Sequence, residues 1–442
     1  MEMQDRVRTG DEKFHIFIDN TVKEISRAYL NDQMPWVVGF SGGKDSTAVL
    51  QLVFRSLAQL PKKKVQKPVH VVCSDTLVEA PYVVGYIDRV LADIERGAKK
   101  LGLPITVNKV VPELEDTFFV NLIGKGYPSP NRWFRWCTER LKIKPTTKFI
   151  QNQIDERGSV VILLGSRKAE SSSRAQVLAN YEIKNSVFRK HASLTNAYVY
   201  APIVDWTTDD VWDFLATYPS SWGGSNWELI KLYKDASGGE CPLVIDTTTP
   251  SCGQSRFGCW VCTVVDADKS MEGFIDSGLI HLQPLLDLRN WLKEIRDDVS
   301  KRDDVRRNST PGLGPFKYEV RHEILKRLFE VSKETGLELI RQEELDLIQS
   351  YWTQDGDSSG MAVKLYNEYF GGDSTMIGEN NHKNQLQEVE LLQQFCQKHS
   401  VNAPDIQSLV EIERQMIGKQ KRRNLHNKID EVIKRVALRE EG

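Results

Sequence analysis

Residues 36–47 read Trp-Val-Val-Gly-Phe-Ser-Gly-Gly-Lys-Asp-Ser-Thr. The apolar run at 36–40 is typical of a buried strand, and the apolar residues between 47 and 57 predict a helix. Two glycines between these elements let the backbone turn tightly, and the amide groups at the start of the helix attract phosphate oxygens. The stretch therefore predicts a phosphate-binding loop. Its expected ligating residues are Ser41, Gly42, Gly43, Lys44, Asp45 and Ser46.

This loop differs from the Walker A loop, in which four residues separate the first glycine from Gly-Lys and Ser or Thr follows. Here three residues separate Gly39 from Gly43, and Lys44 is followed by Asp45. The order Ser-Gly-Gly-x-Asp-Ser resembles the pyrophosphate loop of the ATP pyrophosphatase superfamily. That resemblance implies cleavage of ATP between its α- and β-phosphates, with Lys44 and Asp45 in catalytic roles. Asp45 would serve the accompanying Mg²⁺, or cap the helix instead.

Alternation of strands and helices defines the predicted fold. Strands are expected at 36–40, 69–73, 105–111, 159–165 and 197–201, and helices at 14–30, 47–57, 82–101 and 141–154. This order predicts an α/β fold with a doubly wound, mostly parallel sheet. With the superfamily resemblance, the expected fold is adenine nucleotide α hydrolase-like. We expect this ATP pyrophosphatase domain at 1–216, a Cys-rich region at 217–267 and a helical C-terminal region at 268–442.

Three later segments narrow the resemblance to phosphoadenylyl-sulfate reductases. They are Ser-Asp-Thr-Leu-Val-Glu-Ala-Pro at 74–81, Gly-Ser-Arg-Lys-Ala-Glu-Ser at 165–171, and the segment 202–212, which starts with Pro-Ile-Val-Asp-Trp and ends with Asp-Val-Trp. Each lies at or after a predicted strand end, where ligands bind in open α/β sheets. The resemblance implies that Asp75 and Arg167 approach the nucleotide. Alternatively, Asp75 caps a turn and Arg167 pairs with Glu170, while Thr208 is expected to cap the next helix.

Four of the seven cysteines are grouped as Cys241-x10-Cys252-x6-Cys259-x2-Cys262. Thiolates suit zinc or iron–sulfur clusters, and the uneven spacing favours a [4Fe–4S] cluster over zinc or free thiols. Cys137 stands apart, in Arg-Trp-Cys-Thr at 135–138, beside basic residues that would favour its thiolate. It is a candidate catalytic sulfur carrier, with a structural cysteine as the alternative.

The cysteine layout differs from that of sulfate-assimilation reductases, which have either a Cys-Cys pair with a distant Cys-x-x-Cys or a Glu-Cys-Gly segment. Together with Arg-Phe-Gly-Cys-Trp-Val-Cys-Thr at 256–263, it resembles the DndC family, the sulfurtransferases of bacterial DNA phosphorothioation. This resemblance implies ATP, Mg²⁺ and a [4Fe–4S] cluster as cofactors. It implies DNA, a cysteine desulfurase and other phosphorothioation proteins as partners. A sulfate reductase, a tRNA thiolation enzyme and an ATP-sensing assembly subunit remain the alternatives.

Composition places limits on these partners. The net charge is −2, so DNA contact must come from local patches. The candidates are Lys62–Lys64, Arg306-Arg307 and Lys419–Arg423, with Trp133 and Trp136 as stacking surfaces, although each charge run also suits a solvated face. The sequence has no apolar run of a membrane span, and its polar start is unlike a signal peptide. We therefore expect no membrane association and a cytoplasmic location.

Overall fold

The computed structural model describes residues 2–170, 183, 186–237, 257–307, 310–357 and 359–371. Of the four grouped cysteines, Cys259 and Cys262 are described, whereas Cys241 and Cys252 lie outside the described residues. The basic run Lys419–Arg423 also lies outside them. Within the described part, no helix is both long and apolar enough to span a membrane.

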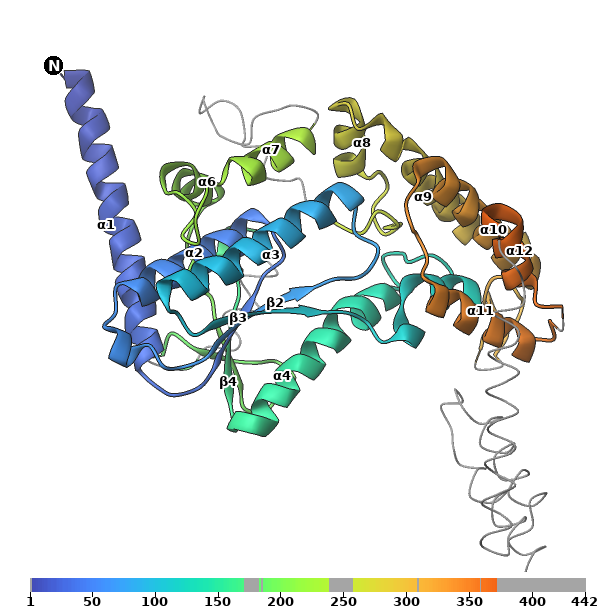
Figure 1. Cartoon of the computed structure of the whole chain (residues 1–442), viewed down its shortest axis with the longest axis horizontal. Coiled ribbons are helices and arrows are strands. Elements are labelled where there is room, and N and C mark those ends of the chain that lie inside the picture. The colour runs from blue at the N-terminus through green and yellow to red at the C-terminus, as the bar shows by residue number, and fades with distance from the viewer. Residues whose placement is uncertain are drawn as a thin grey trace, which may run out of the picture.

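A six-stranded sheet forms the centre of the molecule (Figure 1). Its strand order is β3-β2-β1-β4-β6-β5, and every neighbouring pair is parallel except β5 with β6. The strands are β1 (Trp36–Gly39), β2 (Val69–Ser74), β3 (Ile105–Val110), β4 (Val160–Leu163), β5 (Arg189–Lys190) and β6 (Ala197–Tyr200). The predicted doubly wound, mostly parallel α/β fold is confirmed, with β5 as an unpredicted antiparallel edge strand.

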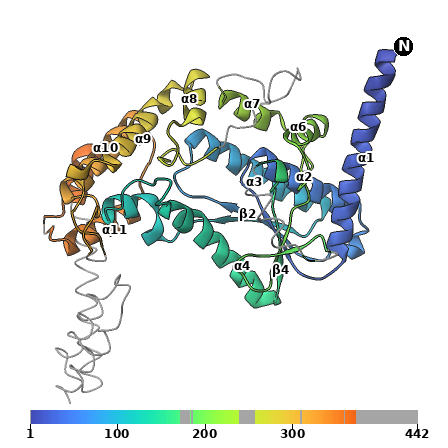
Figure 2. The same cartoon turned by 180° about the vertical axis from the view of Figure 1, so that it is seen from behind.

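Helices cover both faces of this sheet. Helices α1 (Glu2–Leu30), α2 (Lys44–Ala58) and α3 (Pro81–Leu101) lie on one face, and α4 (Lys144–Arg157) lies on the other, as the two opposite views show (Figures 1 and 2). Val38 of β1 packs with the first group, while its neighbour Val37 packs with Ile150 and Ile154 of α4. Successive strand residues point to opposite faces, so a strand buried on both sides must be apolar throughout, as the run at 36–40 is.

Two helices link the sheet to the Cys-rich region. They are α6 (Thr208–Thr217) and α7 (Trp227–Asp235). The N-cap of α6 is Thr207, not Thr208: the Thr207 hydroxyl accepts from the amide of Asp210 at 3.1 Å, and the Asp210 carboxylate accepts from the Thr207 amide at 2.7 Å. This reciprocal capping box satisfies two amides at once, which the prediction of Thr208 missed. Helix α7 was not predicted, because its surroundings are rich in turn-forming residues.

The remaining described helices are α8 (Lys269–Asp276), α9 (Gln283–Arg296), α10 (Tyr318–Thr335), α11 (Gln342–Gln354) and α12 (Met361–Phe370). Of these, α10 and α11 pack against a π-helix, Val120–Gly124, that follows β3. The indole of Trp352, fully buried in α11, donates to the carbonyl of Ile123 at 3.0 Å, and Arg321 donates to that of Gly124 at 2.9 Å. These contacts hold the end of the π-helix, which leads into the segment 126–137, against α10 and α11.

Candidate active site

The phosphate loop lies where the strand order changes direction. β1 and β4 are neighbours, yet the chain builds β2 and β3 on one side of β1 before it returns to β4 on the other. Ligands bind at such a switch point, beyond the carboxyl ends of the strands. Gly42 has φ +71°, which an L side chain rarely adopts. The Ser46 hydroxyl accepts from the Ser41 amide at 3.2 Å and donates to the Gly43 carbonyl at 3.0 Å, so the loop is held closed before any ligand binds.

Two cations converge on Asp45. The buried guanidinium of Arg167, which follows β4, donates to Oδ1 at 2.7 Å, and Lys44 donates to Oδ2 at 3.0 Å. Arg167 thus pairs with Asp45, and Asp45 does not cap the helix, whose N-cap is Gly43. The alternative pairing of Arg167 with Glu170 involves a side chain outside the described ones. This arrangement places two positive charges beside the amides of the loop, which suits a polyphosphate. The roles of Lys44, Asp45 and Arg167 in catalysis and nucleotide binding stay predictions, as does Mg²⁺.

Tyr233, on α7, is a loop contact that the sequence did not indicate. Its hydroxyl accepts from the Lys44 amide at 3.2 Å, and a Cβ on Gly43 would lie 3.3 Å from the same oxygen. The ring packs edge-on against Trp212 and Phe257, with centroids 4.9 and 4.6 Å away. Tyr233 thus occupies an amide at the start of α2, where a phosphate oxygen would otherwise be held.

Gly165 allows the two sides of the switch point to approach. A Cβ at this position would lie 2.8 Å from the carbonyl carbon of Asp45 and 3.0 Å from the amide of Ser46. We expect Gly165→Ala to weaken ATP binding at least about tenfold, because a shift of the loop misplaces donors that together contribute more than 1.4 kcal/mol. Isothermal titration with a non-hydrolysable ATP analogue measures this.

The control for Gly165 is Gly85→Ala, in α3, where a Cβ would meet only the far end of the Arg89 side chain at 3.4 Å. We expect this variant to bind ATP as the unchanged protein does and to be slightly more stable, since alanine favours the helix. Equal affinities for the two variants would contradict the role assigned to Gly165.

Asp75 begins a tight segment after β2. Its carboxylate accepts from Lys109 at 2.9 Å and from the Leu77 amide at 2.8 Å. Burial acts to raise the pKa of Asp75, but the bonds from Lys109 and Leu77 outweigh it and lower the pKa below its usual value. Asp75 thus stabilises the turn, while its position beyond the carboxyl end of β2 is where the predicted nucleotide contact would lie.

The Cys-x-x-Cys unit is fastened to this same segment. Cys259 forms an isolated antiparallel bridge with Glu79, and the Trp260 amide donates to the Val78 carbonyl at 2.9 Å. The Thr76 hydroxyl lies 3.3 Å from the Cys259 sulfur. Burial raises the pKa of the Cys259 thiol to about 12, although the nearby Lys142 acts in the opposite direction. The start of the Cys-x-x-Cys unit is therefore bonded to the segment beyond the carboxyl end of β2, and the phosphate loop lies beyond the carboxyl end of the neighbouring β1.

Cys137 approaches the same unit from another direction. It lies directly before a second π-helix, Thr138–Ile143, a type of distortion that is frequent at functional sites. Burial raises the pKa of Cys137, and the neighbouring Cys262 raises it further, with only a partial opposing effect from Lys142. The expectation that basic neighbours favour its thiolate is therefore wrong for this structure, because desolvation outweighs them.

The family of the chain follows from a match to its sequence. The model of the phosphoadenosine phosphosulfate reductase domain matches residues 35–265, just over half of the chain. The chain belongs to this family. The matched range begins before the phosphate loop and ends after Cys262, so one family domain contains both the loop and the Cys-x-x-Cys unit.

Two relatives of this family member come from Methanocaldococcus jannaschii. The uncharacterized protein MJ0066 is 26% identical over 260 residues, which are 59% of this chain and 42% of the relative. The uncharacterized protein MJ0973 is 28% identical over 176 residues, 40% of this chain and 34% of the relative. The chain thus spans less than half the length of either relative.

Solved structures are similar only at a low level. Phosphoadenylyl-sulfate reductase from Candida auris is 14% identical, with a TM-score of 0.29, over 48% of this chain and 89% of that one. The U34-tRNA thiolase NcsA from Methanococcus maripaludis, solved with its [4Fe-4S] cluster, is 11% identical, with a TM-score of 0.32, over 65% and 79%.

The described thiols suit half of a four-cysteine metal site. The buried guanidinium of Arg289 donates to the Cys262 carbonyl at 2.8 Å and to the Asp266 carbonyl at 3.0 Å, in the turn that follows the Cys-x-x-Cys unit. The turn that presents Cys259 and Cys262 is thus held by groups outside it. In the part of the chain that the structure describes, no three His, Cys, Asp or Glu residues form a metal site. The predicted ligands Cys241 and Cys252 lie outside that part.

The structure places the predicted nucleic-acid contacts in different surroundings. Lys62–Lys64 precede β2 and so lie at the amino ends of the strands, opposite the phosphate loop. Trp136 is only 6% exposed and stacks on Phe118 at 5.2 Å, so the prediction that it is a stacking surface is wrong. Trp133 is 95% exposed.

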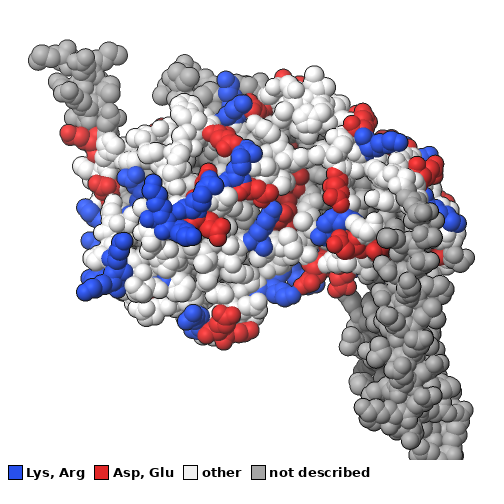
Figure 3. All heavy atoms as spheres, in the orientation of Figure 1, with Lys and Arg blue, Asp and Glu red and all other residues white. Residues whose placement is uncertain are grey.

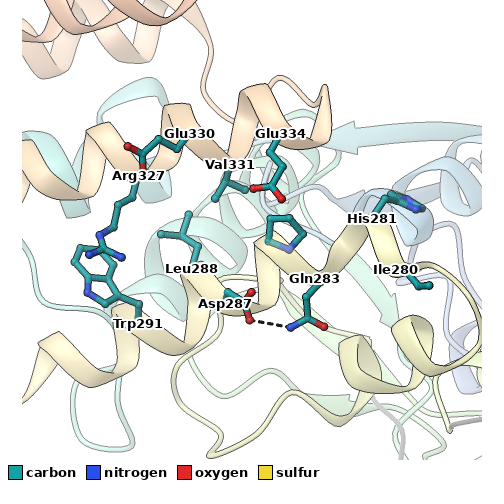
Figure 4. A pocket seen from close by; sticks show the side chains of 11 residues that line it. Ile280, His281, Gln283, Asp287, Leu288, Trp291, Arg327, Glu330, Val331 and Glu334 are labelled. Carbon is teal, nitrogen blue, oxygen red and sulfur yellow. Dashed lines mark hydrogen bonds between the residues drawn. The ribbon is translucent and has the colours of Figure 1, made fainter.

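A separate hollow of about 460 Å³ lies between α9 and α10 (Figure 4). Arg327 of α10 covers the ring of Trp291 at 4.0 Å, and Glu334 of α10 and Asp287 of α9 lie on opposite sides of the hollow. Glu330 accepts a hydrogen bond from the Tyr369 hydroxyl of α12 at 2.9 Å. None of the predicted site residues lines it. The hollow lies outside the family domain and is separate from the phosphate loop.

Proposed function

We propose that the chain is an ATP-dependent sulfurtransferase of DNA phosphorothioate modification, of the DndC type. One observation carries this proposal. Cys259 is bonded, through Glu79 and Val78, to the segment that follows β2, while the phosphate loop follows the neighbouring β1. A thiol and a phosphate loop therefore lie beyond the carboxyl ends of neighbouring strands. This arrangement suits an enzyme that activates an acceptor with ATP and then transfers sulfur to it.

The proposed chemistry begins with attack of a DNA phosphate oxygen on the α-phosphorus of ATP, which releases pyrophosphate and leaves an adenylated backbone phosphate. Lys44 and Arg167 supply positive charge where negative charge develops. Sulfur at the persulfide level, obtained from a cysteine desulfurase, then displaces AMP at the DNA phosphorus. Cys137 holds that sulfur, and a thiol reductant releases the thiophosphate from it.

A [4Fe–4S] cluster on Cys241, Cys252, Cys259 and Cys262 is part of the proposal. Such a cluster, when bound, supplies a redox-active or sulfur-coordinating centre. The residues described here would position it: Arg289 orders the turn, and the Thr263 hydroxyl donates to the Pro130 carbonyl at 2.7 Å, joining the turn to the segment that leads to Cys137. DNA and other phosphorothioation proteins are the proposed partners.

Replacing Cys137 by alanine tests the sulfur-transfer half of the proposal. We expect pyrophosphate release with ATP and DNA to stay within about twofold of the unchanged protein, because Cys137 does not belong to the phosphate loop. We expect sulfur incorporation into DNA to fall to background, since the carrier atom is absent. A coupled pyrophosphate assay and nuclease digestion followed by mass spectrometry measure the two quantities.

The outcomes separate the alternatives. Pyrophosphate release that needs tRNA rather than DNA would replace this proposal with tRNA thiolation. Reduction of phosphoadenylyl sulfate by thioredoxin would replace it with sulfate reduction. Nucleotide binding without turnover in the presence of DNA, tRNA or sulfate would favour an ATP-sensing subunit.

A further inference from the structure

The segment that leads to Cys137 presents an aromatic ring to solvent in a fixed position. Trp133 is 95% exposed, although a large apolar side chain normally gains by burial. The loop beneath it is not loose: the Asn131 carboxamide oxygen accepts from the amides of Trp133 and Phe134, both at 2.8 Å. The indole is therefore held outward by an ordered turn, which costs little further ordering when a ligand binds.

Arginines lie in the loop that carries Trp133 and against its neighbour Tyr127, and they come from two distant parts of the chain. Arg132 and Arg135 flank Trp133 in sequence and are exposed. Phe134 stacks on Tyr127 with centroids 5.9 Å apart, and the guanidinium of Arg307 lies 4.4 Å from the Tyr127 centroid. Arg307 belongs to the segment that the bridges Arg302 with Phe316 and Val305 with Pro311 hold in place. We call Tyr127, Arg132, Trp133, Phe134, Arg135 and Arg307 the aromatic–arginine surface.

Charge distinguishes this surface from the rest of the molecule. Between residues 125 and 144, the basic residues are Lys125, Arg132, Arg135, Arg140, Lys142 and Lys144, and Glu139 is the one acidic residue. Arg140 and Lys144 are paired with Asp116, which leaves Arg132 and Arg135 as the exposed arginines of this stretch. On the face that Figure 3 shows, the described basic and acidic side chains are intermingled. Asp266 lies 3.9 Å from Arg132 but is already bonded to Lys293 at 3.1 Å. An anionic partner therefore fits here better than a neutral or basic partner would.

Distance along the chain ties the surface to the proposed sulfur carrier. Consecutive Cα atoms are about 3.8 Å apart, so the Cα of Trp133 lies within about 15 Å of that of Cys137, and the Cα of Arg135 within about 8 Å. Stacked nucleotides rise about 3.4 Å each, so a base on Trp133 would lie within about four nucleotides of a phosphate at Cys137.

We propose that the aromatic–arginine surface binds the DNA strand that receives sulfur, with one unpaired base stacked on Trp133 and its flanking phosphates on Arg132, Arg135 and Arg307. The inference rests on the proposed function for its choice of DNA. Exposed aromatic rings beside arginines are the usual platform for single strands, because every base has a face that stacks. The surface therefore favours unpaired over fully paired DNA.

Fluorescence anisotropy of a labelled single-stranded oligodeoxynucleotide tests the stacking contact. We expect Trp133→Ala to weaken binding about 5- to 150-fold, the range for loss of one stacked base. The matched control is Trp227→Ala, since Trp227 is 67% exposed on α7 and away from this surface, and it should bind as the unchanged protein does. Circular dichroism should show both variants folded, because each ring lies in solvent.

The salt dependence of binding tests the phosphate contacts. We expect Arg132→Ala/Arg135→Ala to reduce the slope of log affinity against log salt by about 1.4, because each single-strand phosphate contact contributes about 0.7. The control Lys99→Ala/Lys100→Ala removes the same charge from the exposed last turn of α3, outside every candidate DNA contact, and should leave the slope unchanged.

Several results would overturn the inference. One is an unchanged affinity of Trp133→Ala for the oligodeoxynucleotide. Another is equal or tighter binding of RNA or of fully paired duplex by the unchanged protein. A third is a Trp133→Ala variant that loses only sulfur transfer from the desulfurase, which would make the surface a protein-docking site. Pyrophosphate release at saturating DNA separates this inference from the proposed function. If Trp133→Ala binds DNA normally and the unchanged protein still releases pyrophosphate only with DNA, the surface is wrong and the function stands.

Discussion

Lys44→Ala is expected to lower ATP-dependent pyrophosphate release about 100- to 1000-fold, the usual effect of removing one fixed donor to developing charge. The ammonium of Lys44 is held at 3.0 Å from Asp45, whose other oxygen is fixed by Arg167 at 2.7 Å. Its position is therefore set before ATP binds. A steady-state pyrophosphate assay in the presence of DNA, with kcat and KM determined separately, measures the effect.

The fold should survive this change, because Asp45 keeps its partner Arg167. Lys99→Ala is the matched control, since it removes one exposed lysine from the last turn of α3, outside every candidate site, and should leave turnover within about twofold. Turnover in Lys44→Ala that equals the control would contradict the role of the loop in ATP cleavage. A rise in KM with unchanged kcat would instead assign Lys44 to nucleotide binding alone.

Cys262→Ser is expected to reduce bound iron from about four atoms per chain, the content of one [4Fe–4S] cluster, to less than about one. The thiol belongs to the turn that Arg289 holds from within the core, so its replacement removes a ligand without loosening that turn. Iron and sulfide analysis of anaerobically purified protein, together with the absorption spectrum, measures this loss.

Cys137→Ala is the control for the cluster, because Cys137 lies outside the predicted ligand set. It should retain full iron content and the brown colour while it loses sulfur transfer. Stoichiometric zinc in place of iron in the unchanged protein would contradict the cluster assignment. Equal loss of iron in both variants would make Cys137 a ligand rather than a sulfur carrier.

Local patterns were sufficient for the sheet and the loop. Trp36–Phe40 is apolar at every position because β1 is covered on both faces, and that continuous run is visible without any structure. The glycines at 42 and 43 mark the tight turn. Strand β5 escaped prediction because it has only two residues, Arg189–Lys190, and pairs at an edge, where no apolar pattern is needed.

Contacts between distant residues were beyond the sequence. Arg167 lies 122 positions from its partner Asp45, and the nearer Glu170 seemed the simpler partner. Trp136 and Trp133 look alike in sequence, yet Trp136 is buried because its indole donates to the Pro128 carbonyl at 2.9 Å and its ring stacks on Phe118. The raised pKa of Cys137 also depends on burial, which the basic residues around it in sequence do not reveal.

Tyr233 gives the nucleotide loop a mechanical link to the Cys-rich stretch. Its hydroxyl is bonded to the first amide of α2, and its ring rests on Phe257. Helix α7 leads into that stretch, and Phe257 leads out of it, two residues before Cys259. A phosphate oxygen that binds the Lys44 amide would displace the Tyr233 hydroxyl, and the ring contact with Phe257 would pass that displacement toward Cys259. Tyr233 is therefore the described residue that couples occupancy of the loop to the position of this thiol.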